Sequence, residues 1–241
     1  MNKKCEKLLN FGNFKCKKSF LRLKSFYLCG MSEEYLSILE RTSCLYKKYG
    51  IKSVTMDDVS RELGISKKTL YQYFADKEEL VTKIIDHEIE LRNREFDKVF
   101  ASNLNAIDEL FEVNRLMMNM LKEYSPATEY DLKKYYPALF ERIHQIKSRR
   151  MYELVLQNMK KGKEQGIYRQ EMNEEVIAKM HVTRIMNMPE NSMFSREELF
   201  SPSVIMEAFV YHIRGIANQK GLEILEQNLK KLNESNKQQI I

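Results

Sequence analysis

A short segment near residue 70 gathers cations and long polar side chains on one side of an expected helix, residues 66–74. Leu70 and Phe74 lie four residues apart and define the inward side, which leaves Lys67, Lys68 and Gln72 for the opposite side. Ammonium groups bind phosphate, and long polar side chains hydrogen-bond to the edges of bases. This face therefore predicts contact with nucleic acid.

Two further features of this helix favour that interpretation. No acidic residue occurs between Leu63 and Asp76, and the positive end of the helix dipole, at Ser66, attracts phosphate. A solvated basic surface is the alternative, and it is less favoured because tyrosines interleave with the lysines. Tyr71 keeps two interpretations, as a residue that contacts DNA or as a core aromatic.

The elements before this helix place it in a compact module. A first helix is expected between the N-cap Ser32 and the stop signal Gly50. The Thr55 hydroxyl caps a second helix, residues 56–63, and Gly64 supplies a left-handed turn before Ser66 caps the third. A helix, a three-residue turn with glycine and a second helix predict a helix-turn-helix.

The run from Thr55 to Leu80, TMDDVSRELGISKKTLYQYFADKEEL, resembles the signature of the tetracycline-repressor (TetR) family of bacterial regulators. The resemblance covers roughly residues 33–85. It implies a homodimer whose N-terminal three-helix modules bind a palindromic DNA operator. It also implies a helical C-terminal domain that binds a small-molecule inducer, so the expected function is transcriptional regulation, as a repressor released by that inducer.

The resemblance also assigns individual DNA contacts. Phosphate contacts fall on hydroxyls, a phenol and a cation, and base contacts on the long side chains at the start of the third helix. The expected DNA-binding residues are Thr55, Ser66, Lys67, Lys68, Thr69, Tyr71, Tyr73 and Lys77.

One departure from the family pattern shifts the expected base contacts. Positions 57 and 58 often include a basic residue in the family, whereas this chain has Asp57 and Asp58. Base contacts from the second helix are therefore doubtful, and Lys67 and Lys68 on the third helix carry the expectation. Lys77 is assigned to a phosphate, with a simple surface charge as the alternative.

The rest of the chain reads as long helices. No glycine occurs between Gly64 and Gly162, which suits helices better than sheets with tight turns. The expected fold is all-α, with three parts: residues 1–30, a basic extension; 31–78, the helix-turn-helix domain; and 79–241, a helical ligand-binding and dimerisation domain. Helices are expected at 77–100, 106–124, 130–136, 137–165, 173–187, 203–219 and 222–232. Pro126 is expected to interrupt the helical pattern, and residues 233–241 are expected to form a frayed tail.

Two surfaces of the helical domain have candidate roles. Adaptable methionines and aromatic side chains predict a plastic apolar pocket, although core packing is the alternative for each residue. The pocket candidates are Met117, Met118, Tyr124, Phe140, His144, Met151 and Met180. The apolar stripes of helices 173–187 and 203–219 exceed what one chain can cover, which predicts a homodimer, and include Ile185, Val204, Phe209 and Ile213.

The first thirty residues carry eight basic residues against one acid, whereas the remainder is close to neutral. Three interpretations stand: translation that starts at Met31, a disordered basic arm that touches phosphates, and a targeting signal, against which Arg22 and Lys24 argue because they interrupt its apolar stretch. Removing the segment is expected to leave folding and specific DNA binding intact.

Signals for catalysis are weak. The histidines at 87, 144, 181 and 212 and the four cysteines lack metal-ligand spacing, and there is no glycine-rich phosphate loop. We therefore expect no catalytic site, no metal and no cofactor. The cysteines, which form no such pattern, indicate a reduced compartment, so we expect a cytoplasmic protein. Two rival functions remain: an enzyme with an incidental helix-turn-helix, and a structural DNA-binding protein without sequence preference or inducer.

Overall fold

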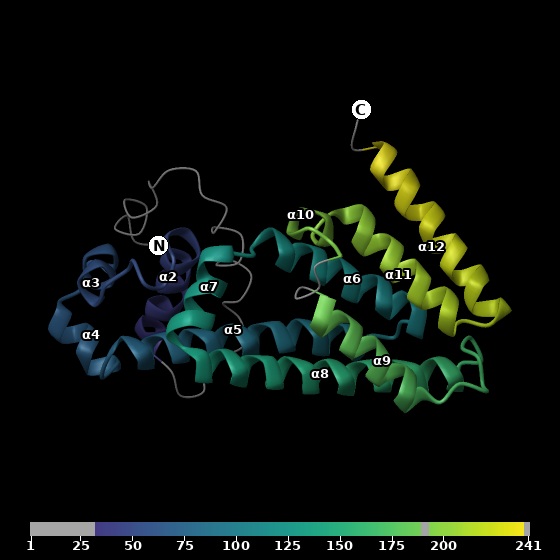
Figure 1. Ribbon diagram of the computed structural model, residues 1–241, viewed down its shortest axis with the longest axis horizontal. Coiled ribbons are helices and arrows are strands. Elements are labelled where there is room, and N and C mark those ends of the chain that lie inside the picture. Colours follow the sequence, from purple (N-terminus) through teal and green to yellow (C-terminus); the bar gives the residue numbers. More distant parts are fainter. Residues whose placement is uncertain (1–31, 189–192, 239–241) are drawn as a thin grey trace, which may run out of the picture. The chain divides into compact units, whose positions relative to one another are not determined.

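The computed structural model describes residues 32–188 and 193–238, which form eleven helices and no strand. The all-α fold expected from the sequence is confirmed (Figure 1). The chain divides into two compact units, one ending at Ile84 and the other beginning at Ile85, so the division lies within α5 (Lys77–Phe100). Within the described ranges, no helix is long and apolar enough to cross a membrane.

The N-terminal unit contains α2 (Glu33–Tyr49), α3 (Met56–Leu63), α4 (Lys67–Tyr73) and the first turns of α5. The Ser32 hydroxyl accepts a hydrogen bond from the Tyr35 amide at 3.1 Å, and Gly50 ends α2 with a positive φ of 80°. Both boundaries confirm the sequence prediction. The helices enclose an apolar core of Ile38, Leu39, Tyr46, Val59, Leu70, Phe74, Leu80 and Ile84.

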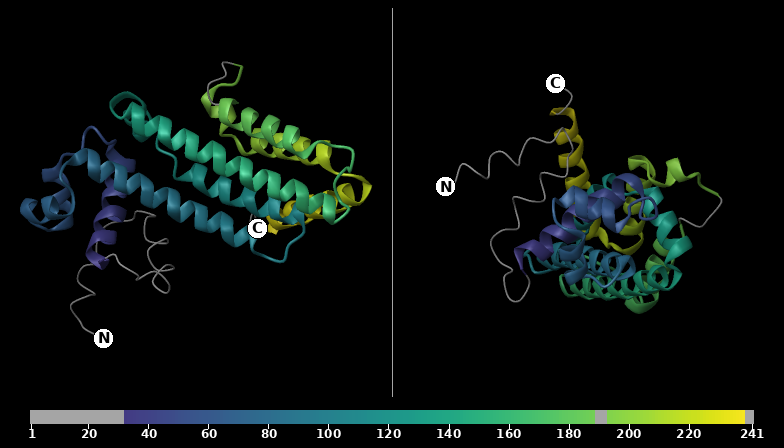
Figure 2. Two further views of the ribbon diagram at one scale, coloured as in Figure 1. Left: turned by 90° about the horizontal axis from the view of Figure 1, so that it is seen from below. Right: turned by 90° about the vertical axis from the view of Figure 1, so that its left-hand side faces the viewer.

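The C-terminal unit contains the remainder of α5 and seven further helices. Within it, α6, α7 and α9 all pack against α8, the longest helix (Figures 1 and 2). Proline occupies the first turn of α7, α8 and α11, where its missing N–H costs nothing. The bounds are α6 (Ala106–Lys122), α7 (Pro126–Tyr135), α8 (Pro137–Glu164), α9 (Glu174–Asn187), α10 (Arg196–Leu199), α11 (Pro202–Ile216) and α12 (Gln219–Gln238).

The core of this unit lies where α6, α8, α11 and α12 meet the turn after α8. Phe111 of α6 meets Phe209 of α11 edge to face, with ring centroids 5.0 Å apart. Fully covered apolar side chains from all four helices and the turn surround this contact: Ala106, Ile107, Met159, Ile167, Tyr168, Met172, Ile213, Ile216, Ala217 and Leu225.

A buried polar cluster ties α6 to α8 within that core. The Asn158 amide donates to the Ala106 carbonyl at 2.8 Å and to the Glu109 carboxylate at 3.0 Å, and it accepts from the Tyr168 hydroxyl at 2.9 Å. Lys161 pairs with the same carboxylate. Burial raises the pKa of Tyr168, so its hydroxyl stays protonated and can donate. Because every member has a partner, this cluster fixes the packing of the two helices.

Several helix boundaries differ from the sequence prediction, and one helix was not expected. Helix α7 begins at Pro126 and not at residue 130, because the Ser125 hydroxyl caps the helix and proline is its first residue. Helix α12 runs to Gln238, so a frayed tail from residue 233 is wrong for residues 233–238. The short helix α10 was not expected. The tail beyond residue 238 and the basic segment 1–30 lie outside the described residues.

The prediction that one chain leaves the apolar stripes of α9 and α11 uncovered is partly wrong. Ile213 is fully buried and Phe209 packs on Phe111, because α6 and α12 cover this side of α11 within one chain. Ile185 and Val204 are half-buried. The large apolar side chains that α9 and α11 expose are Val176, Met180 and Tyr211 among the described residues.

Candidate nucleic-acid interface

Short-range hydrogen bonds build the turn between α3 and α4. Thr55 and Asp58 form a capping box: the Asp58 amide donates to the Thr55 hydroxyl at 3.1 Å, and the Thr55 amide donates to the Asp58 carboxylate at 2.9 Å. Gly64 follows α3 with φ 71° and ψ 26°, a left-handed conformation that residues with a Cβ atom disfavour. The Ser66 hydroxyl then caps α4 by accepting from the Thr69 amide at 3.0 Å. These are the capping residues that the sequence predicts.

A contact from α2 holds the end of α3 in place. The Arg41 guanidinium donates to the Glu62 carbonyl at 2.6 Å and to the Leu63 carbonyl at 3.4 Å. Carbonyls at the C-terminal end of a helix have no partner inside the helix, so a cation there satisfies them and complements the dipole. Arg41 therefore fixes the turn that orients α4.

The exposed face of α4 is the one predicted from the sequence. Leu70 is fully buried, whereas Lys67, Lys68 and Gln72 are exposed. Tyr71 is 43% exposed, which excludes the alternative of a core aromatic. The ammonium of Lys68 has no ion-pair partner among the described residues. The helix thus presents two cations to solvent at its N-terminal end, and a phenol and an amide nearer its C-terminal end.

Lys67 has a partner that the sequence analysis did not assign. Its ammonium lies 2.7 Å from the Asp57 carboxylate of α3, and both side chains remain about half exposed. The hydrogen bond and charge of Asp57 raise the pKa of Lys67. The signal in the sequence was an unassigned acid in the first turn of α3, but the pairing depends on the turn that folds α4 back beside that end of α3.

Other expected phosphate contacts lie around this face. The Tyr73 hydroxyl donates to the Glu34 carboxylate of α2 at 2.8 Å, and this bond raises the pKa of Tyr73. The Thr69 hydroxyl lies 2.7 Å from the Ser66 hydroxyl. Lys77, the first residue of α5, donates to the Lys52 carbonyl at 3.3 Å. The N-terminal unit therefore brings the eight predicted residues together on α3, α4 and the start of α5.

The ligand-binding candidates are more dispersed. Phe140 and His144 lie one turn apart on α8, with ring centroids 5.4 Å apart, and the ring of Tyr124 contacts Phe200 at 5.0 Å. Met180 of α9 is 63% exposed. Met117, Met118 and Met151 are half-buried on α6 and α8.

An open groove runs between α8 and α9. Of the seven ligand-binding candidates, His144 alone lines it in the described chain. Tyr152, Ser148, Thr183 and Met186 line it as well, so its surface mixes polar and apolar groups. The sequence predicts a plastic apolar pocket lined by all seven candidates, and this groove is not that pocket because it contains one of them.

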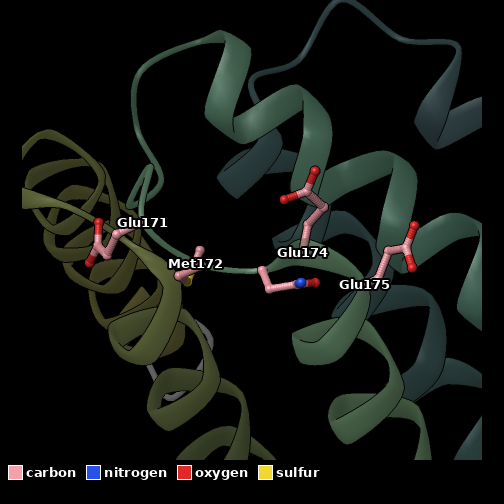
Figure 3. A pocket seen from close by; sticks show the side chains of 5 residues that line it. Glu171, Met172, Glu174 and Glu175 are labelled. Atoms are coloured by element: carbon pink, nitrogen blue, oxygen red, sulfur yellow. The ribbon is translucent and has the colours of Figure 1, made fainter.

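Figure 3 shows a smaller open pocket beside the N-terminal end of α9. Glu171, Met172, Glu174 and Glu175 line it. The Glu174 carboxylate accepts from the Lys163 ammonium at 2.7 Å, and this bond lowers the pKa of Glu174. Acids in the first turn of a helix are favoured by its dipole. The acidic side chains of this pocket are therefore explained by their position at the start of α9.

Two of the four histidines form a half-buried, stacked pair. The rings of His181 on α9 and His212 on α11 stack with centroids 3.7 Å apart. Burial lowers the pKa of His181 to about 2 and that of His212 to about 4, and the nearby charge of Arg184 adds to both shifts. Both rings are neutral at pH 7. Across the part of the chain that the structure describes, no three His, Cys, Asp or Glu side chains gather as metal ligands would.

Comparison with known proteins points to one family. Residues 38–84 match the family described as "Bacterial regulatory proteins, tetR family". The HTH-type transcriptional regulator YfiR of Bacillus subtilis (strain 168) is 26% identical over 195 residues, 74% of this chain and 89% of that protein. A transcriptional regulator from Cytophaga hutchinsonii matches in structure with a TM-score of 0.62 at 20% identity, covering 78% of this chain and all of that one. AibR, solved with isovaleryl coenzyme A and operator DNA, matches with a TM-score of 0.50 at 14% identity, covering 73% and 98%.

Proposed function

Because this chain belongs to the TetR family of bacterial transcriptional regulators, we propose that it represses transcription by binding a palindromic DNA operator as a homodimer and is released by a small-molecule inducer. The observation that carries the proposal is the exposed face of α4. A capped helix that follows a tight turn and presents Lys67, Lys68, Tyr71 and Gln72 to solvent suits the major groove.

The proposed contacts divide into those that read bases and those that bind phosphate. Lys67 and Lys68 lie at the N-terminal end of α4. Their ammonium groups can donate to O6 and N7 of guanine. Thr55, Thr69, Tyr73 and Lys77 surround that face and bind phosphates. Ser66 holds the start of the helix, and Tyr71 contributes to base contacts.

The dimer surface is proposed on α9 and α11. The stacked rings of His181 and His212 show that these helices lie side by side. Val176, Met180 and Tyr211 are 49%, 63% and 73% exposed, and large apolar side chains on a helix pair favour burial against a second chain. Two helices from each chain would form a four-helix interface.

The inducer site is proposed in the C-terminal unit, near the half-buried methionines Met117, Met118 and Met151 and the aromatic side chains of Tyr124 and Phe140. Flexible thioethers adapt to apolar ligands. His144 and Met180 are the more peripheral candidates, in the groove and on the surface. AibR, which has this fold, was solved in complex with isovaleryl coenzyme A and operator DNA, so a chain of this fold can hold a small molecule as well as DNA. We place the protein in the cytoplasm, where its operator lies.

Selection of DNA fragments from the source genome tests the proposal. Purified protein is expected to enrich a few fragments, each with a two-fold symmetric site that it protects from nuclease cleavage as two protomers. A structural DNA-binding protein, the alternative function, would retain fragments without a common site. That outcome would refute the proposed regulator.

A further inference from the structure

The ion pair between Asp57 and Lys67 joins the two helices of the helix-turn-helix at the surface expected to meet DNA. The ammonium and the carboxylate lie 2.7 Å apart, with 54% and 55% of the two side chains exposed. Both groups are therefore accessible to a partner. They belong to different helices that the turn at Gly64 holds together.

The two neighbouring acids of α3 differ in what they do. Asp58 is used inside the protein, because its carboxylate accepts from the amide and the hydroxyl of Thr55 at 2.9 and 2.6 Å. Asp57 has no such role within the helix, and its carboxylate extends to the first residue of α4. Asp57 is thus the acid of α3 that is available at the DNA-facing end.

A carboxylate at this place opposes DNA binding unless it gains a hydrogen bond there. It repels phosphate, and it offsets the charge of Lys67, which lowers the attraction of Lys67 for any DNA sequence. Among the groups in the major groove, the N4 amino group of cytosine donates to Asp and Glu side chains, and guanine O6 and N7 accept from Lys. A G·C pair offers both partners.

We propose that Asp57 and Lys67 together read one G·C pair in each half-site: Lys67 donates to guanine O6 or N7, and Asp57 accepts from N4 of the cytosine paired with it. The inference rests on the proposed sequence-specific DNA binding. It makes Asp57 a determinant of specificity, because guanine and thymine leave its carboxylate facing DNA without a donor, and adenine places its N6 donor beside the N7 acceptor, which repels a carboxylate.

Selection from a random duplex library compares the native chain with Asp57→Ala. The native protein is expected to enrich a symmetric site with a fixed G·C position in each half. Asp57→Ala should bind scrambled duplex about fivefold more tightly at low salt, because a repelling charge is lost. Its enriched site should lose the G·C preference at that position, which the two residues read together, and retain the preferences at the other positions.

Glu62→Ala is the matched control, because Glu62 is an exposed acid on the same helix. This variant removes the same charge without touching the proposed reader, so its enriched site should equal that of the native chain. Asp57→Asn provides a second test that preserves the size of the side chain. Since Asn pairs with adenine N6 and N7, its preference should shift from cytosine towards adenine.

The outcomes separate the inference from the function on which it rests. If the native chain enriches no site, sequence-specific binding itself is refuted. If it enriches a site and both Asp57 variants, folded by circular dichroism, enrich the same bases, then Asp57 reads no base and the inference is overturned. A double variant with Lys67→Ala should lose no more discrimination at this position than either single variant, since the two residues act on it together.

Discussion

Several side chains expected to meet DNA already have partners within the protein. Lys67 pairs with Asp57, Tyr73 donates to Glu34, and Lys77 donates to the Lys52 carbonyl. DNA must replace these bonds, so the net binding free energy gained from each contact is smaller than the contact would give if its side chain had no partner. Such competition favours DNA sequences that offer hydrogen-bond partners to both members of a pair.

Lys67 and Lys77 are expected to act differently on DNA. Lys67→Ala removes a base contact and should weaken binding to the enriched site about tenfold to hundredfold, with a much smaller effect on scrambled duplex. Lys77 lies at the start of α5, so Lys77→Ala should weaken both duplexes alike and reduce the salt slope by about one per protomer. Titrations of both duplexes at several salt concentrations measure this. An equal loss for Lys67→Ala on both would show that Lys67 contacts phosphate alone.

The half-buried pair of His181 and His212 predicts a pH dependence of stability. The folded pKa values of His181 and His212 lie below the ordinary value of about 6.5, so the unfolded chain takes up protons first as the pH falls. Their contribution is complete above pH 6.5 and is lost as the pH falls from there towards 4 for His212 and towards 2 for His181, at up to about 1.4 kcal/mol per pH unit for each ring.

Urea unfolding between pH 7.5 and 4.5 checks this prediction. Carboxylates titrate in part of this range, so the comparison is with His212→Phe, which keeps an aromatic ring and removes one titrating group. Its free energy of unfolding should fall less steeply with pH than that of the native chain. Parallel curves would contradict the assignment of two neutral rings with lowered pKa values.

At the scale of elements, the end of α8 depends on a close approach between a helix and the turn that follows it. The ring of Tyr168 covers Gly162, and a Cβ at residue 162 would lie 2.1 Å from that ring. The same tyrosine donates to Asn158, so the ring cannot move without breaking a buried hydrogen bond. Glycine at this point of the helix is required by packing.

Gly162→Ala is therefore expected to destabilise the protein by about 1 to 3 kcal/mol, despite the higher helix propensity of alanine. Gly215→Ala is the matched control, because Gly215 also lies in a helix and a Cβ there meets nothing within 4 Å. This control should be neutral or stabilising by up to about 1 kcal/mol. Chemical denaturation measures both, and equal effects would contradict the packing argument.

Local capping signals made most helices predictable, and tertiary contacts account for much of the rest. Ser32, Thr55 and Ser66 cap helices where the sequence places them. The missed helix α10 also has a local signal, since Ser195 and Glu198 exchange hydrogen bonds between side chain and backbone as a capping box does.

The candidate site divides in the same way. The exposed face of α4 follows from helical spacing, so Lys67, Lys68 and Gln72 could be predicted. The pairing of Lys67 with Asp57 and of Tyr73 with Glu34 depends on how helices separated in sequence pack, which spacing alone does not give. The burial of Ile213 has the same origin, because α6 and α12 cover it.

At the scale of the whole molecule, the exposed apolar side chains of α9 and α11 predict a dimer. Met180→Glu places a charge where the proposed interface would bury it, which costs far more in a dimer than on a free surface. Light scattering at micromolar concentration should find the native chain as a dimer and the variant shifted towards monomer. Lys179→Glu is the control for added negative charge on the same helix. A native monomer would refute the dimer.

The central claim is sequence-specific recognition of DNA by the N-terminal unit. Its most direct test is competition, in which a labelled duplex that the protein has enriched is displaced by unlabelled enriched duplex or by random duplex at near-physiological salt. The account predicts that random duplex is at least about a thousandfold less effective, the usual lower range for specific regulators. Equal displacement by the two duplexes would contradict it.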